Sequence, residues 1–372
     1  MRAAVFHGQG DVRVEHVADP TCGPGDLLLE VAAVGICGTD AHEFRSGPHM
    51  FPIETRHPVS GHVGPMIPGH ELAGIVREVG AGVTGFAPGD LVVSGAGISC
   101  GECVQCRRGR TNLCQSYSTI GLQQNGGLAE LVAVPAAICV NAEGTGLTPD
   151  AAALAQPMAI AVHAMRRGRL TEQDEAVILG AGGIGAFLTF AVSQTTSTVA
   201  VFDLDSERLS IADRLGASHV GRIGEVDPAT AVEDWGIAPT VVYEVSGTAA
   251  GLRSALAMHT KGARVVVVGL QEGDFTIGAR RLSLEEQELI GTNAHVCGTD
   301  LPEAVRLLAL RKEGWSDVAP VALALDDLVS EGLRPLAEGR SSRIKTLIDP
   351  RAEKSRSTTM SRREPAAKGA QR

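Results

Sequence analysis

The chain has 372 residues, 44% hydrophobic and 20% charged, so at roughly 100–200 residues per domain it holds two or three domains with a sizeable core. Aromatic residues make up only 3% and the formal net charge is −10, which disfavours nucleic acid as a partner. No apolar run approaches the ~18 residues of a membrane span and no signal peptide is visible, so we expect a cytoplasmic protein without membrane contact.

The first part of the chain is β-rich, because short apolar runs at 27–34, 91–93 and 128–134 are separated by glycine and proline. From residue 176 onward, apolar strand patterns alternate with helical ones, which predicts βαβ units and a parallel sheet. The expected strands are 176–179, 198–202, 240–245 and 264–268, and the expected helices are 184–193, 206–215 and 249–259. A helix at 299–310 with Asp300 as its cap and a strand at 342–349 follow.

The last 22 residues, 351–372, carry seven Lys/Arg against two acids and almost no large apolar side chain. Such a composition cannot bury enough apolar surface to fold, so we expect a disordered basic tail.

Four cysteines lie in one short segment, with two, two and seven residues between them: Cys100, Cys103, Cys106 and Cys114. Thiolates this close in sequence can close a tetrahedron around Zn²⁺. A site whose four positions are all filled by protein leaves no place for substrate, so this zinc would be structural. Two disulfides, free thiols or an iron–sulfur cluster are the alternatives.

A second candidate metal site combines Cys37, in the segment 35–42, with His70 and Glu71. A thiolate and an imidazole from separate loops can hold a catalytic Zn²⁺ with one position left open. Each residue alone is weak evidence, because a single cysteine is usually a small buried hydrophobe. Their occurrence in a chain that also carries the four-cysteine segment strengthens the hypothesis.

These motifs resemble the medium-chain, zinc-dependent alcohol dehydrogenase family. The zinc-site signature is matched at 69–74, followed by Gly80 and Val83, and the segment 44–68 resembles the butanediol/polyol (sorbitol) dehydrogenase-like branch. The resemblance covers residues 1 to about 350 and implies an α/β fold, with a Rossmann-type doubly wound sheet and a β-rich GroES-like catalytic domain. The catalytic domain would span 1–155 and 294–350, and the dinucleotide-binding domain 156–293.

The resemblance also implies roles for residues of the second site. Cys37 and His70 would be zinc ligands, and Glu71 an adjacent ligand or exchangeable carboxylate. Thr39 would bind the substrate oxygen and begin a proton relay that continues to His42. Asp40 would orient a ligand, as carboxylates near metal-bound histidines commonly do, or would simply cap the loop.

Gln156 departs from the family pattern, because the polyol branch commonly has a glutamate at this position. One thiolate and one imidazole would leave a divalent ion with a net charge of +1, and Glu71 is the nearest carboxylate in sequence. We therefore expect Cys37, His70 and Glu71 to hold the catalytic zinc with water, and Gln156 to bond that water or the substrate. Alternatively, the Gln156 amide oxygen is the ligand and Glu71 lies outside the metal's coordination.

A G-x-G-x-x-G motif lies between an expected strand and an expected helix, where glycines allow a tight turn and close approach of a pyrophosphate. Its cofactor-binding residues are Gly180, Gly182, Gly183, Ile184 and Gly185. Asp203 follows about 20 residues later, where an acid bonds the adenosine ribose and repels the extra phosphate of NADP, so we expect NAD. Asp205 is an alternative acid for the ribose, but we expect it to cap the next helix. Arg208 either flanks the adenosine or is an ordinary surface charge. By the same resemblance, four further residues lie beside the cofactor: Ser246, Val268, Gly269 and Leu270.

The most consistent function is a zinc-dependent oxidoreductase that transfers a hydride between NAD and a secondary alcohol/ketone pair, with a diol, polyol or sugar-alcohol-like substrate. A zinc-independent quinone or enoyl reductase of the same fold and a non-enzymatic zinc-binding interaction protein are the alternatives. Family members are often oligomeric, which implies a homodimer or homotetramer.

Overall fold

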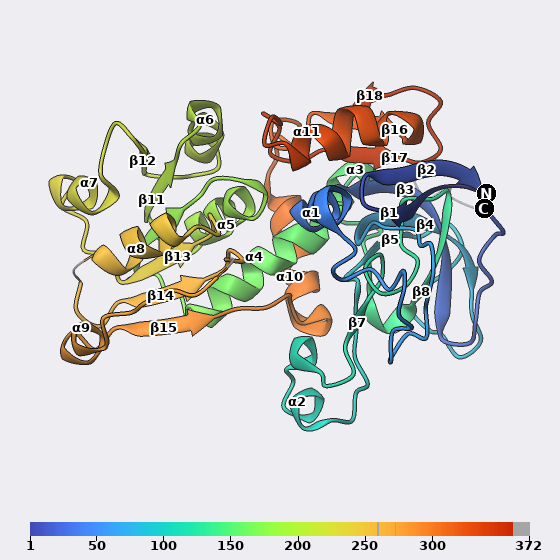
Figure 1. Ribbon diagram of the computed structural model, residues 1–372, viewed down its shortest axis with the longest axis horizontal. Helices are drawn as coiled ribbons and strands as arrows, with labels where there is room; N and C mark the ends of the chain where they lie inside the picture. The colour runs from blue at the N-terminus through green and yellow to red at the C-terminus, as the bar shows by residue number, and fades with distance from the viewer. Residues whose placement is uncertain (259, 272, 360–372) are drawn as a thin grey trace, which may run out of the picture. The chain divides into compact units, whose positions relative to one another are not determined.

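The computed structural model describes residues 1–258, 260–271 and 273–359. The chain divides into two compact units, Met1–Ala159 with His295–Arg372, and Ile160–Ala294. Figure 1 shows that the chain leaves the first unit, completes the second, and returns to the first. Helix α4 (Ala155–Arg167) carries the chain from the first unit into the second.

The first unit is built on an eight-stranded sheet in the order β18-β16-β17-β3-β4-β5-β9, with β8 also paired to β3. Two two-stranded sheets, β1-β2 and β6-β7, accompany it. The strands are β1 (Arg2–Gly8), β2 (Asp11–His16), β3 (Asp26–Gly35), β4 (Glu71–Val79), β5 (Leu91–Ser94), β6 (Gly97–Ile98), β7 (Ser118–Thr119), β8 (Leu131–Pro135), β9 (Cys139–Asn141), β16 (Val321–Ala324), β17 (Leu347–Asp349) and β18 (Arg356–Ser357). The core lies around the apolar β3, whose Leu29, Val31 and Val34 are fully buried.

The helices of the first unit are short apart from the one through which the chain returns. They are α1 (Gly38–Ser46), α2 (Val104–Arg107), η1 (Thr111–Leu113), η2 (Ala136–Ile138), α3 (Pro149–Ala152), α10 (Cys297–Leu310), η3 (Leu325–Asp327), η4 (Leu328–Leu333) and α11 (Arg334–Ala337). Asp300 was expected to cap α10, but the helix begins earlier, with Val296 as its N-cap. The Asp300 carboxylate still serves the helix end, because it accepts a 2.7 Å hydrogen bond from the Val296 backbone N–H.

The second unit is a six-stranded sheet in the order β12-β11-β10-β13-β14-β15, with every neighbouring pair parallel. Its strands are β10 (Glu175–Leu179), β11 (Thr198–Asp203), β12 (His219–Arg222), β13 (Val241–Glu244), β14 (Arg264–Val267) and β15 (Glu288–Gly291). Its helices are α5 (Gly183–Ser193), α6 (Ser206–Arg214), α7 (Pro228–Asp234), α8 (Ala249–Ala257) and α9 (Ala279–Leu284). The predicted parallel sheet is confirmed, and the valine-rich β14 has its two central residues fully buried, as a strand covered on both faces requires.

Several expected boundaries differ from the structure. The helix expected at 249–259 ends at Ala257, and residue 259 lies outside the described residues. Of the strands expected at 128–134 and 342–349, only Leu131–Pro135 and Leu347–Asp349 form ladders.

The prediction of a disordered tail is wrong for residues 351–359. There β18 pairs antiparallel with β16, and Arg356 makes ion pairs with Asp150 and Asp349. A specific cation thus anchors a segment whose composition alone gives no reason to fold. Residues 360–372 lie outside the part of the chain that the structure describes.

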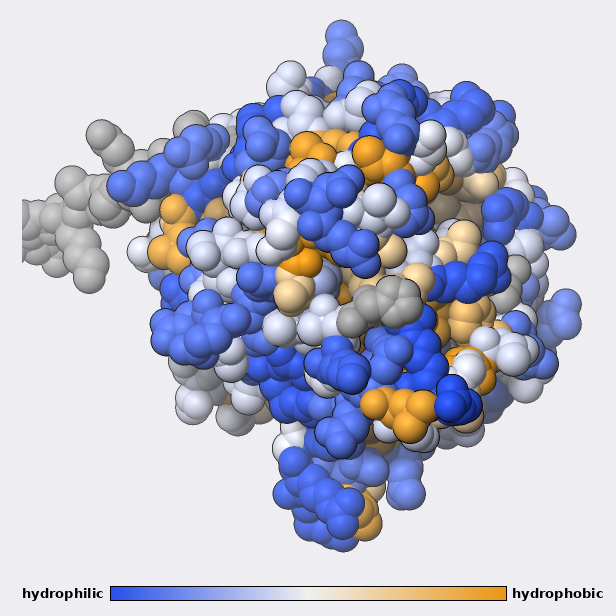
Figure 2. All heavy atoms as spheres, turned by 90° about the vertical axis from the view of Figure 1, so that its left-hand side faces the viewer, coloured by the Kyte–Doolittle hydropathy of each residue, from blue (hydrophilic) through white to orange (hydrophobic). Residues whose placement is uncertain are grey.

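None of the helices in the described part of the chain combines the length and the apolarity needed to cross a bilayer. On the face drawn in Figure 2 hydrophilic residues predominate, and the hydrophobic residues form separate groups.

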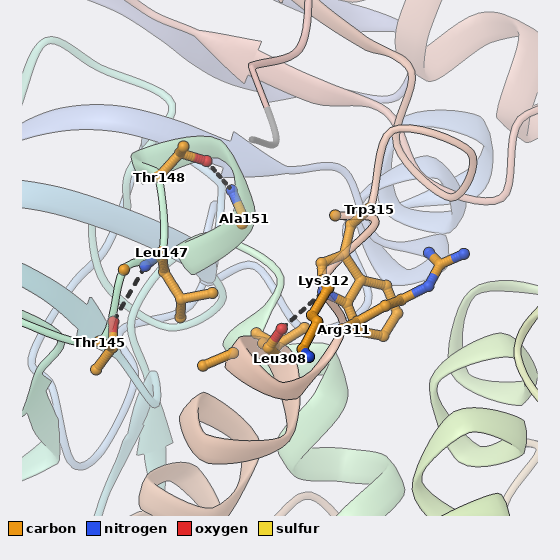
Figure 3. Close-up of a pocket in the computed structure, with 11 residues that line it drawn as sticks. Thr145, Leu147, Thr148, Ala151, Leu308, Arg311, Lys312 and Trp315 are labelled. Atoms are coloured by element: carbon orange, nitrogen blue, oxygen red, sulfur yellow. Dashed lines mark hydrogen bonds between the residues drawn. The ribbon is translucent and has the colours of Figure 1, made fainter. Parts of the chain in front are cut away.

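A hollow in the first unit lies between the segment that leads into α3 and the end of α10 (Figure 3). Thr148 caps α3 by accepting a 3.2 Å hydrogen bond from the Ala151 N–H, and the Trp315 indole donates to the Leu308 carbonyl at 3.0 Å. The space is about 10 Å³, room for one water molecule at most. This hollow is therefore not a substrate site.

Candidate metal and dinucleotide sites

The candidate catalytic site lies where β3 ends and the neighbouring strand β4 begins. Cys37 follows β3, His70 precedes β4, and the antiparallel register places Gly35 opposite Glu71. A side chain at Gly35 would collide with Glu71, because its Cβ would lie 2.2 Å from Oε2. Glycine at this position is what lets the Glu71 carboxylate fold back over β3.

Ligand atoms of Cys37, His70 and Glu71 all lie within 4.8 Å of one another, and both His70 and Glu71 are buried. The three predicted ligands are therefore brought together, although they come from two separate segments of the chain. Thiolate sulfur, imidazole nitrogen and carboxylate oxygen are the donor types that Zn²⁺ takes at catalytic sites, so these side chains fit the metal.

Of the two roles considered for Asp40, the structure forms the cap and leaves the carboxylate near His70 without a hydrogen bond to it. Its Oδ2 accepts a 2.9 Å hydrogen bond from the Cys37 backbone N–H at the start of α1, which is a cap. Its Oδ1 lies 3.7 Å from His70 Nδ1, too far for a hydrogen bond, and neither buried atom has another partner among the described residues. A small movement of the ring would join them, and the other ring nitrogen would then be free to bind a metal.

The acidic groups around the candidate metal site stabilise a positive charge on His70. Burial by itself lowers the pKa of His70, but the nearby Asp40 carboxylate, the Cys37 thiol and Glu71 outweigh burial and raise that pKa to about 9. Burial dominates at Asp40, whose pKa is raised above its ordinary value although His70 opposes the shift. A pocket that stabilises an imidazolium cation in this way also attracts a metal cation.

Lys345 is a site residue that the sequence analysis missed. Its ammonium lies 2.5 and 2.6 Å from the two carboxylate oxygens of Glu71 and 3.4 Å from the Ile36 carbonyl. Both charged side chains are buried, at 5% and 1% exposure. Burial lowers the pKa of Lys345, but Glu71 and the Cys37 thiol outweigh it and the net shift is upward.

The Lys345 ion pair changes the charge balance of the metal site, because Glu71 already has a cationic partner. The sequence carries little signal for this pair, because the expected strand at 342–349 also contains Arg343, Thr346 and Asp349, so Lys345 has the appearance of an ordinary polar position. Lysines are almost never fully buried without a partner, and the buried acid that pairs with this one is distant in sequence.

The two residues assigned to the proton relay lie on α1, next to the metal ligands. The Thr39 hydroxyl lies 3.7 Å from the Cys37 sulfur, so it borders the candidate metal position. His42 lies one turn further along the helix and is half-buried. Its ring stacks on His49, with centroids 4.6 Å apart and planes inclined by 15°. Gln156 lies in the first turn of α4 and is 8% exposed.

The four-cysteine segment forms a compact cluster around α2. The sulfurs of Cys103 and Cys106 are 3.6 Å apart and those of Cys114 and Cys100 are 3.4 Å apart, and all four lie within 4.8 Å of one another. A disulfide bond is about 2.05 Å long, so these are not disulfides, and all eight cysteines are free. In a tetrahedron with Zn–S bonds of about 2.3 Å the sulfurs are about 3.8 Å apart, so the cluster fits a structural zinc.

Backbone N–H groups donate hydrogen bonds to the sulfurs of this cluster, which stabilises the thiolate form that binds metal. The Cys100 N–H donates to the Cys114 sulfur at 3.2 Å, and the Cys103 N–H donates to the Cys100 sulfur at 3.4 Å. Hydrogen bonds from the backbone at Cys106 and Gln115 lower the pKa of the Cys103 thiol to about 6. The thiolate is the form that binds metal, so these backbone hydrogen bonds favour the metal-binding form of Cys103.

In the second unit, the glycine motif forms the turn between β10 and α5. Gly180 has φ +106°, and a Cβ at Gly185 would lie 1.9 Å from the Gly180 carbonyl oxygen. These positions accept only glycine, and α5 then begins at Gly183 with its amides directed toward the turn. The predicted phosphate-binding turn is therefore formed, with Ile184 and Gly185 in the first turn of the helix.

Asp203 ends β11 next to this turn. Its carboxylate accepts hydrogen bonds from the Ala181 N–H at 2.7 Å and from the Asp205 N–H at 2.9 Å. The predicted cap at Asp205 is confirmed, since its side chain accepts from Glu207 and Arg208. The Arg208 Nε is buried without a hydrogen-bond partner among the described residues, and its Nη1 would lie 3.8 Å from a Cβ at Gly182. The guanidinium also lies 3.9 Å from the Asp205 carboxylate, so an anionic cofactor at this turn would share it with that residue.

The other predicted cofactor residues follow β13 and β14 at the carboxyl edge of the same sheet. The backbone N–H groups of Val268 and Gly269 both donate to the Glu244 carbonyl, at 2.8 and 3.0 Å. Ser246 donates its hydroxyl proton to the Glu244 carboxylate, and Leu270 is 88% exposed. The edge that carries the glycine turn thus also carries these residues, as the topology of a doubly wound sheet requires.

Comparison with known proteins places both units in one family. The alcohol dehydrogenase GroES-like domain matches residues 23–144, and the zinc-binding dehydrogenase domain matches residues 183–309. The chain is 31% identical to (R,R)-butanediol dehydrogenase of Bacillus subtilis over 94% of this chain and 100% of that protein. It is 32% identical to sorbitol dehydrogenase of the same organism over 73% of this chain and 75% of that protein.

Solved structures agree with this assignment. The crystal structure of 2R,3R-butanediol dehydrogenase from Bacillus subtilis superposes on this structure with a TM-score of 0.85 and 29% sequence identity. The match covers 94% of this chain and 99% of that chain. A zinc-binding dehydrogenase of Sinorhizobium meliloti bound to NADP has a TM-score of 0.83 at 27% identity, over 94% of this chain and 99% of that chain.

The chain belongs to the zinc-binding alcohol dehydrogenase family. It is an oxidoreductase that uses zinc and a nicotinamide dinucleotide, and its resemblance to the butanediol/polyol branch is confirmed.

Proposed function

We propose that this enzyme oxidises a secondary hydroxyl of a vicinal diol or polyol to the ketone, reversibly, with NAD as the hydride acceptor. The observation that carries the proposal is the convergence of Cys37, His70 and Glu71 on one buried point, with Asp40 behind the histidine. The relatives named for butanediol and sorbitol support a substrate with more than one hydroxyl.

When bound, the zinc supplies Lewis-acid chemistry at the substrate oxygen and the dinucleotide takes up a hydride. The chain's own residues do the remaining work. Cys37 and His70 would hold the metal. At the rim of the site the Thr39 hydroxyl accepts the hydroxyl proton of the substrate while it releases its own proton toward His42, one turn along α1. The partly exposed His42 imidazole takes up that proton and releases it to solvent.

We assign Glu71 as the third protein ligand, with Gln156 bonded to the water or substrate. The pair with Lys345 makes this ligand weaker than a free carboxylate, because one ammonium already compensates its charge. The proposal therefore includes a shared carboxylate, held by Lys345 on one side and available to the metal on the other.

For the cofactor we assign NAD rather than NADP. Asp203 is held by two backbone amides, so its carboxylate cannot turn away from a phosphate on the ribose. Two further properties belong to the proposal alone: a cytoplasmic location and a homodimeric or homotetrameric assembly.

The test is a panel of vicinal diols, polyols, hydroxyketones, quinones and enones, followed through NADH absorbance. We expect NAD reduction with at least one diol or polyol, and loss of that activity by a factor on the order of 100 or more in Cys37→Ser. Cys22→Ser is the matched control, because Cys22 only bonds the carbonyls of Asp26 and Glu78 and should keep full activity. Turnover of quinones or enones alone, unaffected by Cys37→Ser, would favour the zinc-independent reductase instead.

A further inference from the structure

His42, the last residue of the proposed proton relay, is covered on one face by a second histidine. The imidazole rings of His42 and His49 are stacked, with centroids 4.6 Å apart and planes inclined by 15°. Aromatic rings attract each other at centroid distances of about 4.5–7 Å. His42 is half-buried and His49 is exposed, so His49 is the outer ring of the pair. The reaction as proposed above assigns no role to this outer ring.

A buried acid ties the segment that carries His49 to the helix that carries His42. Glu43, on α1, is 1% exposed, and its carboxylate oxygens accept hydrogen bonds from the backbone N–H groups of His49, at 2.9 Å, and Met50, at 2.6 Å. The Gly47 N–H, at the end of the helix, donates to the Glu43 carbonyl at 2.8 Å. The backbone after α1 is therefore folded back against the helix, and His49 cannot leave His42 without breaking a hydrogen bond to a buried carboxylate.

A hydrogen bond in the plane of its ring fixes the orientation of His49. The Ser46 hydroxyl donates to the His42 carbonyl at 3.2 Å, and its oxygen lies 3.0 Å from Nε2 of His49. A hydroxyl has one proton, so this bond to the carbonyl leaves Nε2 of His49 to donate to the hydroxyl oxygen. His49 is thus held at its backbone and at one ring nitrogen, and it presents a ring face to His42. In this arrangement it can orient the His42 ring but cannot exchange a proton with it directly.

A stacked partner restricts the plane of a histidine ring. Rotation of the His42 imidazole about its Cβ–Cγ bond would turn the edge of the ring toward His49 and end the stack. Imidazole takes up and releases protons at its two nitrogens, whose lone pair and N–H bonds lie in the ring plane. A fixed plane therefore fixes the directions in which His42 can receive a proton on one nitrogen and release one from the other.

We propose that His49 is a positioning residue for proton release, because its stacked ring keeps the His42 imidazole in the orientation that completes the relay. His42 takes up the proton that leaves Thr39 on one ring nitrogen and releases the proton of the other nitrogen to water, while the hydride goes to NAD. Without the stack, His42 turns away for part of the time and proton release slows. This inference rests on the proposed alcohol oxidation and its relay through His42.

The experiment records the first turnover of NADH formation by the full-length zinc enzyme with NAD and the diol or polyol that the substrate panel identifies. His49→Ala should slow this turnover about three- to tenfold, the effect expected from losing one aromatic contact, with an unchanged KM for the diol and an unchanged zinc content. A hindered pyridine buffer, which is too crowded to bind the zinc, should restore the rate because it accepts the proton in place of His42.

Two matched variants show whether the stacked ring is the cause. His49→Phe keeps an aromatic ring over His42 without the imidazole nitrogens, so it should react at the rate of the unmodified enzyme and gain nothing from the buffer. His16→Ala, which removes an exposed histidine from β2, should change neither the rate nor the response to buffer.

A double variant separates positioning from a general effect on the fold. His42→Ala should be slow and restored by the same buffer, and adding His49→Ala should cause no further loss, because no ring is left to orient. The inference alone is overturned if His49→Ala reacts normally, if the buffer does not restore it, or if His49→Phe is equally slow. An unmodified enzyme that oxidises no diol or polyol overturns the proposed function, and this inference with it.

Discussion

Replacing Lys345 by methionine tests whether the buried pair with Glu71 stabilises the catalytic unit. At 2.5–2.6 Å the two charges attract each other by about 6 kcal/mol in an effective dielectric of about 20. Desolvation of both ions offsets much of this attraction, so the pair itself contributes little net stability. Removing only the lysine leaves the Glu71 carboxylate buried and unpaired, which costs about 3–5 kcal/mol.

Urea unfolding of Lys345→Met should therefore show a loss of about 3–5 kcal/mol when the catalytic metal has been removed by mild chelation. The loss should be smaller in the zinc-loaded enzyme, because the metal then compensates the charge of Glu71. The double variant Glu71→Gln/Lys345→Met should recover most of the stability, since no buried charge is left alone.

Arg351→Ala is the matched control for this experiment. Arg351 pairs with Glu30 at 2.9 Å, but the two side chains are 44% and 39% exposed, so its removal should cost under about 1 kcal/mol. If Lys345→Met is no more destabilised than Arg351→Ala, Glu71 does not depend on Lys345 and the charge balance described for the metal site is wrong.

Three further predictions concern ligands, cofactor and tail. Glu71→Ala should lose the catalytic zinc while Gln156→Ala keeps it but turns over poorly; metal analysis showing the opposite ranking would transfer the ligand role to Gln156. Asp203→Ala should weaken NAD binding and relax discrimination against NADP, because an acceptor and a negative charge disappear; kcat/KM for both cofactors measures this, and a preference of the unmodified enzyme for NADP would refute it. Arg356→Ala should lower the free energy of unfolding in urea by about 1–3 kcal/mol, because it leaves the buried Asp150 without its ion pair. A loss no larger than that of Arg351→Ala would mean that Arg356 does not anchor the segment 351–359.

Local sequence patterns predicted the elements whose causes are local. The glycine turn after β10, the cap at Asp205 and the parallel direction of the strands in the second unit all follow from neighbouring residues and from periodicity. The strand order and the short strands β12 and β15 were not predicted. The four-cysteine cluster belongs to the same group, because its ligands lie within one short segment of chain.

Features that depend on distant parts of the chain could not be derived in the same way. Lys345 and Glu71 are 274 residues apart, and only the pairing of β17 with β3 brings them together. Arg356 likewise meets Asp150 across 206 residues, so the basic composition of the tail concealed an anchored segment. The convergence of Cys37 with His70 was suggested by resemblance, and the β3–β4 register supplies its physical cause.

Activity of this enzyme should depend on one open, exchangeable zinc site that is distinct from a closed structural one. A chelation time course on the purified full-length enzyme, recording zinc content and diol-dependent NADH formation in the same samples, measures this dependence. We expect two zinc ions per chain at the start, loss of activity in step with the first ion removed while the fold persists, and recovery on adding zinc. Full activity after removal of one ion, or an active enzyme that contains one ion or none from the start, would contradict it.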